Sequence, residues 1–229
     1  WDPTKWNTEN LTSFTTQWAE VQFGNKQAEK IASMLMRYTN YNARRKPELL
    51  SPETYSLTHY REFEGVVSEY NQLAKEANEL YTSIATEYKD AFYQLVLFPI
   101  LACANLNELY YTTALNRLYA QQGRAATNAM AERVSTLFKK DKELTDYHNN
   151  TLANGKWSHM MDQTHIGYTY WQQPPVNAMP EVNKITLPAT PSLGVAIEGT
   201  TKWWPNEKGE AVLPIFDSFI KQQHYIEIF

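Results

Sequence analysis

The chain is predicted to adopt a mainly α-helical fold, followed by a shorter region of β-strands. Residues 6–154 hold three of the eight glycines and repeat apolar side chains with the period of a helix. After Gly155, prolines cluster and short runs rich in Val, Ile and Leu replace that period. We therefore expect a helical bundle over 1–154, an aromatic and polar interdomain loop over 155–183, and over 184–229 a β-linker with the start of a truncated C-terminal β-sandwich.

The first two helices are expected at 8–23 and 26–41. The apolar side chains of the first share one face of a 3.6-residue period: Leu11, Phe14, Trp18 and Val21. Gly24 can adopt the left-handed conformation that ends a helix. Pro47 and Pro52 predict an extended connection to the third helix.

Three further helices are expected at 59–85, 87–122 and 127–154. The helix at 87–122 is apolar around much of its circumference, as is typical of a central helix, and Pro99 should kink it. Five long amphipathic helices joined by short loops favour an up-and-down bundle. A helical repeat array is the less favoured alternative, because the five helices share no common sequence period.

Strand-like runs occur at 184–188, 193–198 and 225–229. The last run alternates in polarity up to Phe229. Because an unpaired edge strand invites aggregation, we expect a β-domain to continue beyond this run. The chain also begins with Trp1 and shows no signal-peptide pattern. These features predict that the chain is excised from a larger protein.

The composition is that of an ordinary globular domain, with 43% hydrophobic and 20% charged residues. A net charge of −4 argues against nucleic acid as a partner, because binding phosphates needs an excess of Lys and Arg. No uninterrupted apolar run reaches the length of about 20 residues that a membrane span requires. Cys103 is the one cysteine and lies among apolar residues, so a buried structural thiol is expected.

The sequence carries no motif that predicts a catalytic centre. It has no Glu-x-x-His pair for a di-metal bundle, no glycine-rich phosphate loop and no Gly-x-Ser-x-Gly elbow. The carboxylates of the third and fifth helices lie mostly opposite the apolar stripes, where solvated faces are the ordinary explanation. A glycosidase needs two carboxylates held in a pocket, and no pair is set apart here.

One stretch, 155–182, stands out because it is long, aromatic and polar without a regular period. Its candidate binding residues are His159, Asp162, Gln163, His165, Tyr168, Tyr170 and Trp171. We expect polar side chains buried under the loop. A role at a domain junction or at the rim of a sugar site is the second interpretation. The spacing His159-x-x-Asp162-x-x-His165 also resembles a metal set, but residues six apart do not share a helix face, so no metal site is assigned.

The same loop carries a resemblance to a known family. The run HMMDQTHIGYTYWQQP at 159–174 is similar to one found in the α-glucuronidases of glycoside hydrolase family 115. Three other runs resemble the same family: YNARRKPELL at 41–50, YKDAFYQLV at 88–96 and CANLNELY at 103–110. The similarity extends through essentially the whole chain.

The resemblance implies a four-part parent enzyme, in which a helical bundle lies between a catalytic (β/α)8 barrel and a β-sandwich. Such enzymes remove glucuronic acid or its 4-O-methyl form from xylan, with inversion and without a cofactor. Their catalytic and uronate-binding residues belong to the barrel, so none is transferred to this chain. The implied partners are the barrel, the β-sandwich, xylan oligosaccharides bound through the parent and a second copy in a homodimer. The implied localisation is extracytoplasmic, either periplasmic or secreted.

The leading hypothesis is therefore a non-catalytic module of a xylan-debranching α-glucuronidase. It would orient neighbouring domains, and the isolated chain would be inactive. A carbohydrate-binding module is the alternative, with Trp171, Trp203 or Trp204 as stacking platforms, although a packed loop is the preferred interpretation of the last two. A metal-dependent hydrolase built on His159, Asp162 and His165 is a third hypothesis.

Overall fold

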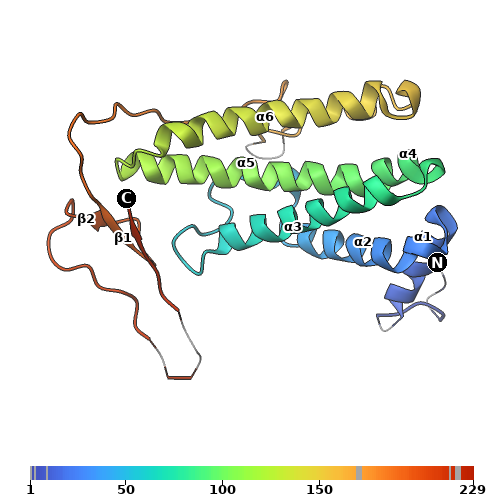
Figure 1. Cartoon of the computed structure of the whole chain (residues 1–229), viewed down its shortest axis with the longest axis horizontal. Coiled ribbons are helices and arrows are strands. Elements are labelled where there is room, and N and C mark those ends of the chain that lie inside the picture. Colours follow the sequence, from blue (N-terminus) through green and yellow to red (C-terminus); the bar gives the residue numbers. More distant parts are fainter. Residues whose placement is uncertain (1, 3, 9, 169–171, 217, 220–222) are drawn as a thin grey trace. The chain divides into compact units, whose positions relative to one another are not determined.

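The computed structural model describes residues 2, 4–8, 10–168, 172–216, 218–219 and 223–229 (Figure 1). Its helices are α1 (Leu11–Phe23), α2 (Ala28–Asn42), α3 (Glu62–Ser83), α4 (Lys89–Phe92), α5 (Phe98–Gln121) and α6 (Thr127–Asn150). A small sheet follows, made of β1 (Val195–Ile197), β2 (Trp203–Trp204) and β3 (Ile226–Ile228). Because a π-helical turn joins α4 to α5 without a break, the described residues form five long helices. The predicted mainly α-helical fold is confirmed.

The π-helical turn η4 (Tyr93–Leu97) is the main irregularity of the helical part. It ends two residues before Pro99, which has no N–H to donate to the preceding turn and whose ring crowds that turn. A π-turn inserts one extra residue and so relieves this conflict without ending the helix. The irregularity expected around Pro99 therefore takes the form of a local change in helical period.

The described chain contains one helix that is long and apolar enough, by length and composition, to cross a membrane: Thr86–Gln121. Two thirds of its most apolar window is buried inside the protein. A central helix of a globular bundle has the same properties, so this finding is weak support for a span.

The chain divides into two compact units, which are described separately. Unit 1 comprises residues 1–50, 68–107 and 139–178, and unit 2 comprises 51–67, 108–138 and 179–229. The domain boundaries expected from the sequence stay a prediction.

In unit 1, the aromatic residue that ends α1 helps to form the core. Phe23 packs edge-on against Phe92, with 5.9 Å between ring centroids, and Ile31 and Met34 of α2 are fully buried. Gly24, with φ of 75°, follows α1 and lies against Tyr88. The stripe predicted for the first helix is wrong in part: Phe14 and Val21 are 38% and 81% exposed, and α1 packs through its other side, with Ala19 and Phe23 buried.

Unit 2 contains the sheet, in the order β2-β1-β3 with both pairs antiparallel. Val195 lies opposite Trp204 on one side and Ile228 on the other. Trp203 and Trp204 thus form a short strand, whereas the sequence analysis favoured a packed loop.

The strand predicted at 184–188 is not present in the described structure. The side chain of Asn116 instead bonds both the N–H and the carbonyl of Asn183, at 2.7 and 2.9 Å. Asn128 does the same for Ile185, with both distances at 3.0 Å. Each side-chain amide supplies the donor and acceptor that a partner strand would supply. The extended backbone is therefore satisfied without a ladder.

Candidate functional site

The loop after α6 folds back onto that helix through a left-handed turn. Ala153 and Asn154 have φ of 49° and 58°, and Gly155 has φ of 76°. Asn149, which is buried at the end of α6, then accepts a bond from the N–H of Met161 at 2.9 Å and donates to Asp162 Oδ1 at 2.8 Å. This single amide fixes the returning loop.

His159 and Asp162 form the first pair of predicted site residues that the structure brings together. His159 Nδ1 lies 2.6 Å from Asp162 Oδ2, and the histidine backbone has φ of 65°. Both side chains are mostly exposed to solvent. The pair lies on the outer face of the loop.

His165 faces a different carboxylate, which the sequence analysis did not single out. Its Nε2 lies 2.9 Å from both oxygens of Asp141, and its Nδ1 lies 3.1 Å from the carbonyl of Gln163. Because a carboxylate and a carbonyl are both acceptors, the ring makes both hydrogen bonds only when both of its nitrogens carry a proton, as they do in an imidazolium. The hydrogen bond to Asp141 accordingly raises the pKa of His165, against the opposing effect of burial.

A cavity of about 300 Å³ lies beside this pair in unit 1. Apolar side chains form much of its wall, including Phe98, Leu106, Leu144 and Met160, and its polar edge includes Glu48, Asp141, Gln163 and His165. We call it the loop cavity. Cys103 also lines it, but burial raises the pKa of this thiol, so it is held in its unreactive form.

The remaining predicted residues are placed only in part. Gln163 Nε2 lies 3.4 Å from Tyr168 Oη, within the same loop. Tyr170 and Trp171 lie outside the described residues. His159 and His165 turn toward separate carboxylates, and the described residues include no group of three His, Cys, Asp or Glu side chains that could hold a metal ion. In the structure, the two histidines whose spacing suggested a metal set therefore face different carboxylates.

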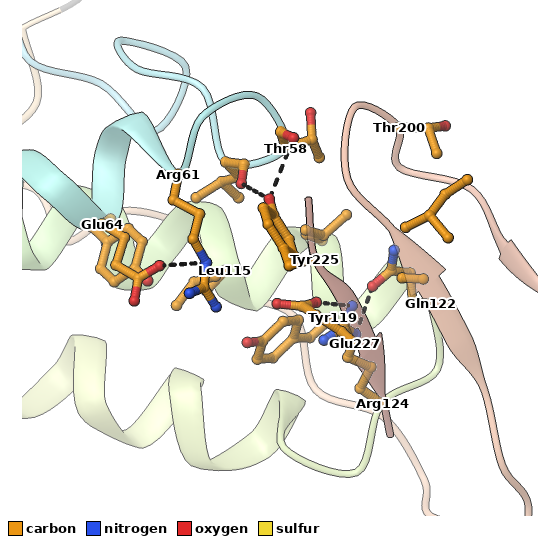
Figure 2. A pocket seen from close by; sticks show the side chains of 15 residues that line it. Thr58, Arg61, Glu64, Leu115, Tyr119, Gln122, Arg124, Thr200, Tyr225 and Glu227 are labelled. Atoms are coloured by element: carbon orange, nitrogen blue, oxygen red, sulfur yellow. Dashed lines mark hydrogen bonds and ion pairs between the residues drawn. The ribbon is translucent and has the colours of Figure 1, made fainter. Parts of the chain in front are cut away.

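A second cavity, of about 170 Å³, lies within unit 2 (Figure 2). Its wall combines charged, amide and phenol side chains from segments far apart in sequence: Arg61, Glu64, Tyr111, Tyr119, Gln122, Arg124, Tyr225 and Glu227. We call it the polar cavity. Burial is the main cause that raises the pKa values of Tyr111, Tyr119 and Tyr225, so these phenols stay neutral.

Arg124 anchors the inner wall of the polar cavity. It is 6% exposed, donates from Nε to Gln122 Oε1 and from Nη2 to Glu227 Oε2, each at 2.6 Å, and its guanidinium lies over the Tyr119 ring. Gln122 is itself held by its bond to the carbonyl of Thr201 at 2.9 Å. The arginine is therefore paired and positioned before any ligand arrives.

Arg61 occupies the opposite, more exposed wall. Its Nε lies 3.0 Å from Glu64 Oε2, and its guanidinium lies 4.6 Å from the Tyr225 ring centre. Tyr225 is fixed in turn, because its hydroxyl donates to the carbonyls of Leu57 and Thr58. Figure 2 shows these groups around one space, with Glu227 and Arg124 on its other side.

Comparison with known proteins finds a family match in the N-terminal part of the chain. Residues 1–49 match the model of glycosyl hydrolase family 115. This segment contains α1 and α2 and most of the run at 41–50 that carried the resemblance. The match supports a fragment of a family 115 protein and bears out the resemblance within residues 1–49, whereas the resemblance of the runs at 88–96, 103–110 and 159–174 stays a prediction. No curated protein matches the chain.

Sequence reasoning missed Asp141, although a signal was present. Val134, Leu137 and Asp141 are spaced so that all three lie on the buried face of α6, and His148 continues the same face. A carboxylate at such a position needs a partner. The polar cavity gave no comparable signal, because its residues come from four separate segments.

Proposed function

We propose that this chain is a non-catalytic module of an α-glucuronidase that removes glucuronic acid, or its 4-O-methyl form, from xylan. In this proposal it orients the catalytic barrel and the β-sandwich of the parent enzyme. It would also contribute to a homodimer and act outside the cytoplasm. The match to glycosyl hydrolase family 115 supports the glycoside hydrolase parent.

The main observation that supports the non-catalytic role is the contact between Asp141 and His165. Hydrolysis of a glycosidic bond needs one carboxyl group that gives a proton and a second carboxylate that acts on the other face of the sugar. Both oxygens of Asp141 lie 2.9 Å from Nε2 of His165, and Asp141 is only 5% exposed. Glu64 and Glu227 in the polar cavity are likewise paired with arginines. The pairing of each of these acids with a basic side chain supports the non-catalytic role.

A substitution in the parent enzyme distinguishes a structural role of Asp141 from a catalytic role. If Asp141 only holds His165 in position, Asp141→Asn should lower kcat less than about tenfold. Loss of a general acid or base would lower kcat about 10²–10⁴-fold. Asp146→Asn is the matched control, because Asp146 is exposed on the same helix and bonds only Lys142 among the described residues. Glucuronic acid release from aldouronic acids is the measurement. A loss above a hundredfold in Asp141→Asn, with Asp146→Asn unaffected and both proteins folded, would contradict the proposal.

The isolated chain provides the complementary assay. It should release glucuronic acid from aldouronic acids no faster than buffer alone does. Circular dichroism of the same sample should show that its helices are formed. Measurable turnover that Asp141→Asn abolishes would assign catalysis to this chain and refute the non-catalytic role.

A further inference from the structure

The polar cavity of unit 2 has a balanced set of charges. Arg61 is paired with Glu64 and Arg124 with Glu227, so two cations and two anions face one space. An anionic ligand would gain from the arginines but would meet both carboxylates. A cationic ligand would gain from the carboxylates but would meet both arginines. The wall therefore favours a ligand without net charge.

An apolar ligand is also disfavoured by this wall. Removing water from Arg61, Glu64 and Glu227 without replacing its hydrogen bonds would cost more than an apolar contact returns. Hydroxyl groups solve the problem, because each can donate to a carboxylate and accept from a guanidinium or a phenol. The wall chemistry thus favours a ligand that carries several hydroxyls.

The size of the cavity limits the ligand further. The cavity has a volume of about 170 Å³. It is smaller than the pockets of about 300–1,000 Å³ that enclose drug-sized molecules. A single sugar ring is of the appropriate size, whereas a longer oligosaccharide would have to extend beyond the cavity.

The backbone that carries Arg61 provides an independent observation. Tyr60 and Arg61 have φ of 59° and 51°, and neither is a glycine. Two successive left-handed residues of this kind are strained, and strain of this type clusters at sites that hold a side chain in a required position. The turn is maintained by bonds of Ser56 to His59 and Phe63, and it places Arg61 over Tyr225.

We propose that the polar cavity is a binding site for a neutral monosaccharide ring, held by hydroxyl contacts to Glu64, Arg61 and Glu227. Arg124 and Tyr225 form the preorganised part of the site. Arg61 and Glu64, which are about half exposed, form its accessible side. This site is separate from the tryptophans considered as stacking platforms, and it does not depend on which reaction the parent enzyme catalyses.

Titration of the full chain with D-glucose, D-xylose and sodium D-glucuronate, followed by amide NMR shifts, tests the proposal. The two neutral sugars should bind saturably with millimolar dissociation constants, as expected for so small a ligand, and the shifts should map to residues around Tyr225. D-Glucuronate keeps the ring of glucose, but a carboxylate replaces the hydroxymethyl group, so it should bind more weakly.

The variants Arg61→Gln and Glu64→Gln should each weaken binding of the neutral sugars at least fivefold. Both side chains are exposed enough for the fold to persist, and either variant can serve if the other fails to fold. Arg117→Gln is the matched control, because Arg117 lies on α5 in the same unit and pairs with Glu53 outside the cavity.

Three results would overturn the proposal. They are no saturable shift with either neutral sugar in the folded protein, tighter binding of D-glucuronate than of D-glucose, or binding that both cavity variants leave unchanged. None of these results bears on glucuronic acid release by the parent enzyme, so the two proposals can fail separately.

Discussion

The His165 imidazolium needs its proton to make both of its hydrogen bonds. Its folded pKa is raised above the ordinary value of 6.5, so the proton stabilises the folded state. This contribution is complete below about pH 6.5 and is lost as the pH rises through the folded pKa. Asp141, which is nearly fully buried, would then face a neutral ring. The loop of residues 159–168 should therefore be held more firmly in mildly acidic solution.

His165→Gln tests this expectation. The substitution should lower the free energy of unfolding by about 2 kcal/mol at low pH, where a charge-assisted hydrogen bond is lost, and by less at high pH. Urea unfolding from about pH 5 to pH 9 measures the difference between the two proteins. A difference that grows as the pH rises would contradict the assigned protonation state.

His148 makes the comparison with the variant necessary. This ring is fully buried, and burial lowers its pKa, so it destabilises the folded state as the pH falls. Its effect has the opposite sign to that of His165. Because His148 is present in both proteins, its contribution cancels in the difference between them.

At the scale of the elements, two glycines, Gly65 in α3 and Gly194 just before β1, make opposite predictions. Gly65 is an exposed position in α3, and an added Cβ would meet no atom within 4 Å. Gly65→Ala should therefore raise the free energy of unfolding by about 0.5–1 kcal/mol. Gly194 bonds Phe229 through both backbone groups, at 2.7 and 3.0 Å, and an added Cβ there would collide with the Phe229 ring.

Gly194→Ala should cost about 1–3 kcal/mol, because the ring must move and the end of the β1–β3 pair must shift with it. Chemical denaturation of both alanine variants gives the two values. Equal effects of the two substitutions would show that the close approach of Phe229 to Gly194 is not a feature of the folded protein.

The helices were predictable to within four residues, the largest difference being the end of α6, predicted at residue 154 and found at Asn150. Their apolar period makes the helices visible in the sequence. It did not identify the buried face of α1, where Val21 of the predicted stripe is 81% exposed and Ala19 is buried instead. The strand expected at 184–188 was wrong for a physical reason. Its composition suits an extended backbone, but Asn116 and Asn128 satisfy that backbone with side-chain amides.

The candidate sites were less predictable than the helices. Asn149, Asp162 and His159 lie near one another in sequence, so the loop that contains them was recognised as unusual. The pairing of His165 with Asp141 joins residues 24 apart, and Arg124 joins Glu227 across 103 residues. Contacts of this length depend on tertiary packing, which a local period does not contain.

At the level of the complete molecule, the sheet formed by the described residues of unit 2 has two edge strands, β2 and β3. β3 is an edge strand, and its Ile226 and Ile228 side chains are 55% and 67% exposed. The preceding segment adds further exposed apolar side chains, Val212, Ile215 and Phe216. An apolar edge of this kind is a template for pairing with another strand. In the proposed parent enzyme, the β-sandwich would supply that strand.

The chain on its own should then associate in a concentration-dependent way, and Ile228→Lys should reduce this association, because a charged side chain on an edge strand opposes pairing. Sedimentation velocity over a range of protein concentrations measures the effect. Val21→Lys is the matched control, since Val21 is 81% exposed on α1 and belongs to no strand. Equal loss of association in both variants would indicate nonspecific apolar contact. If the chain stays monomeric at every concentration, β3 is not a docking surface. There would then be no reason to expect a neighbouring strand beside it.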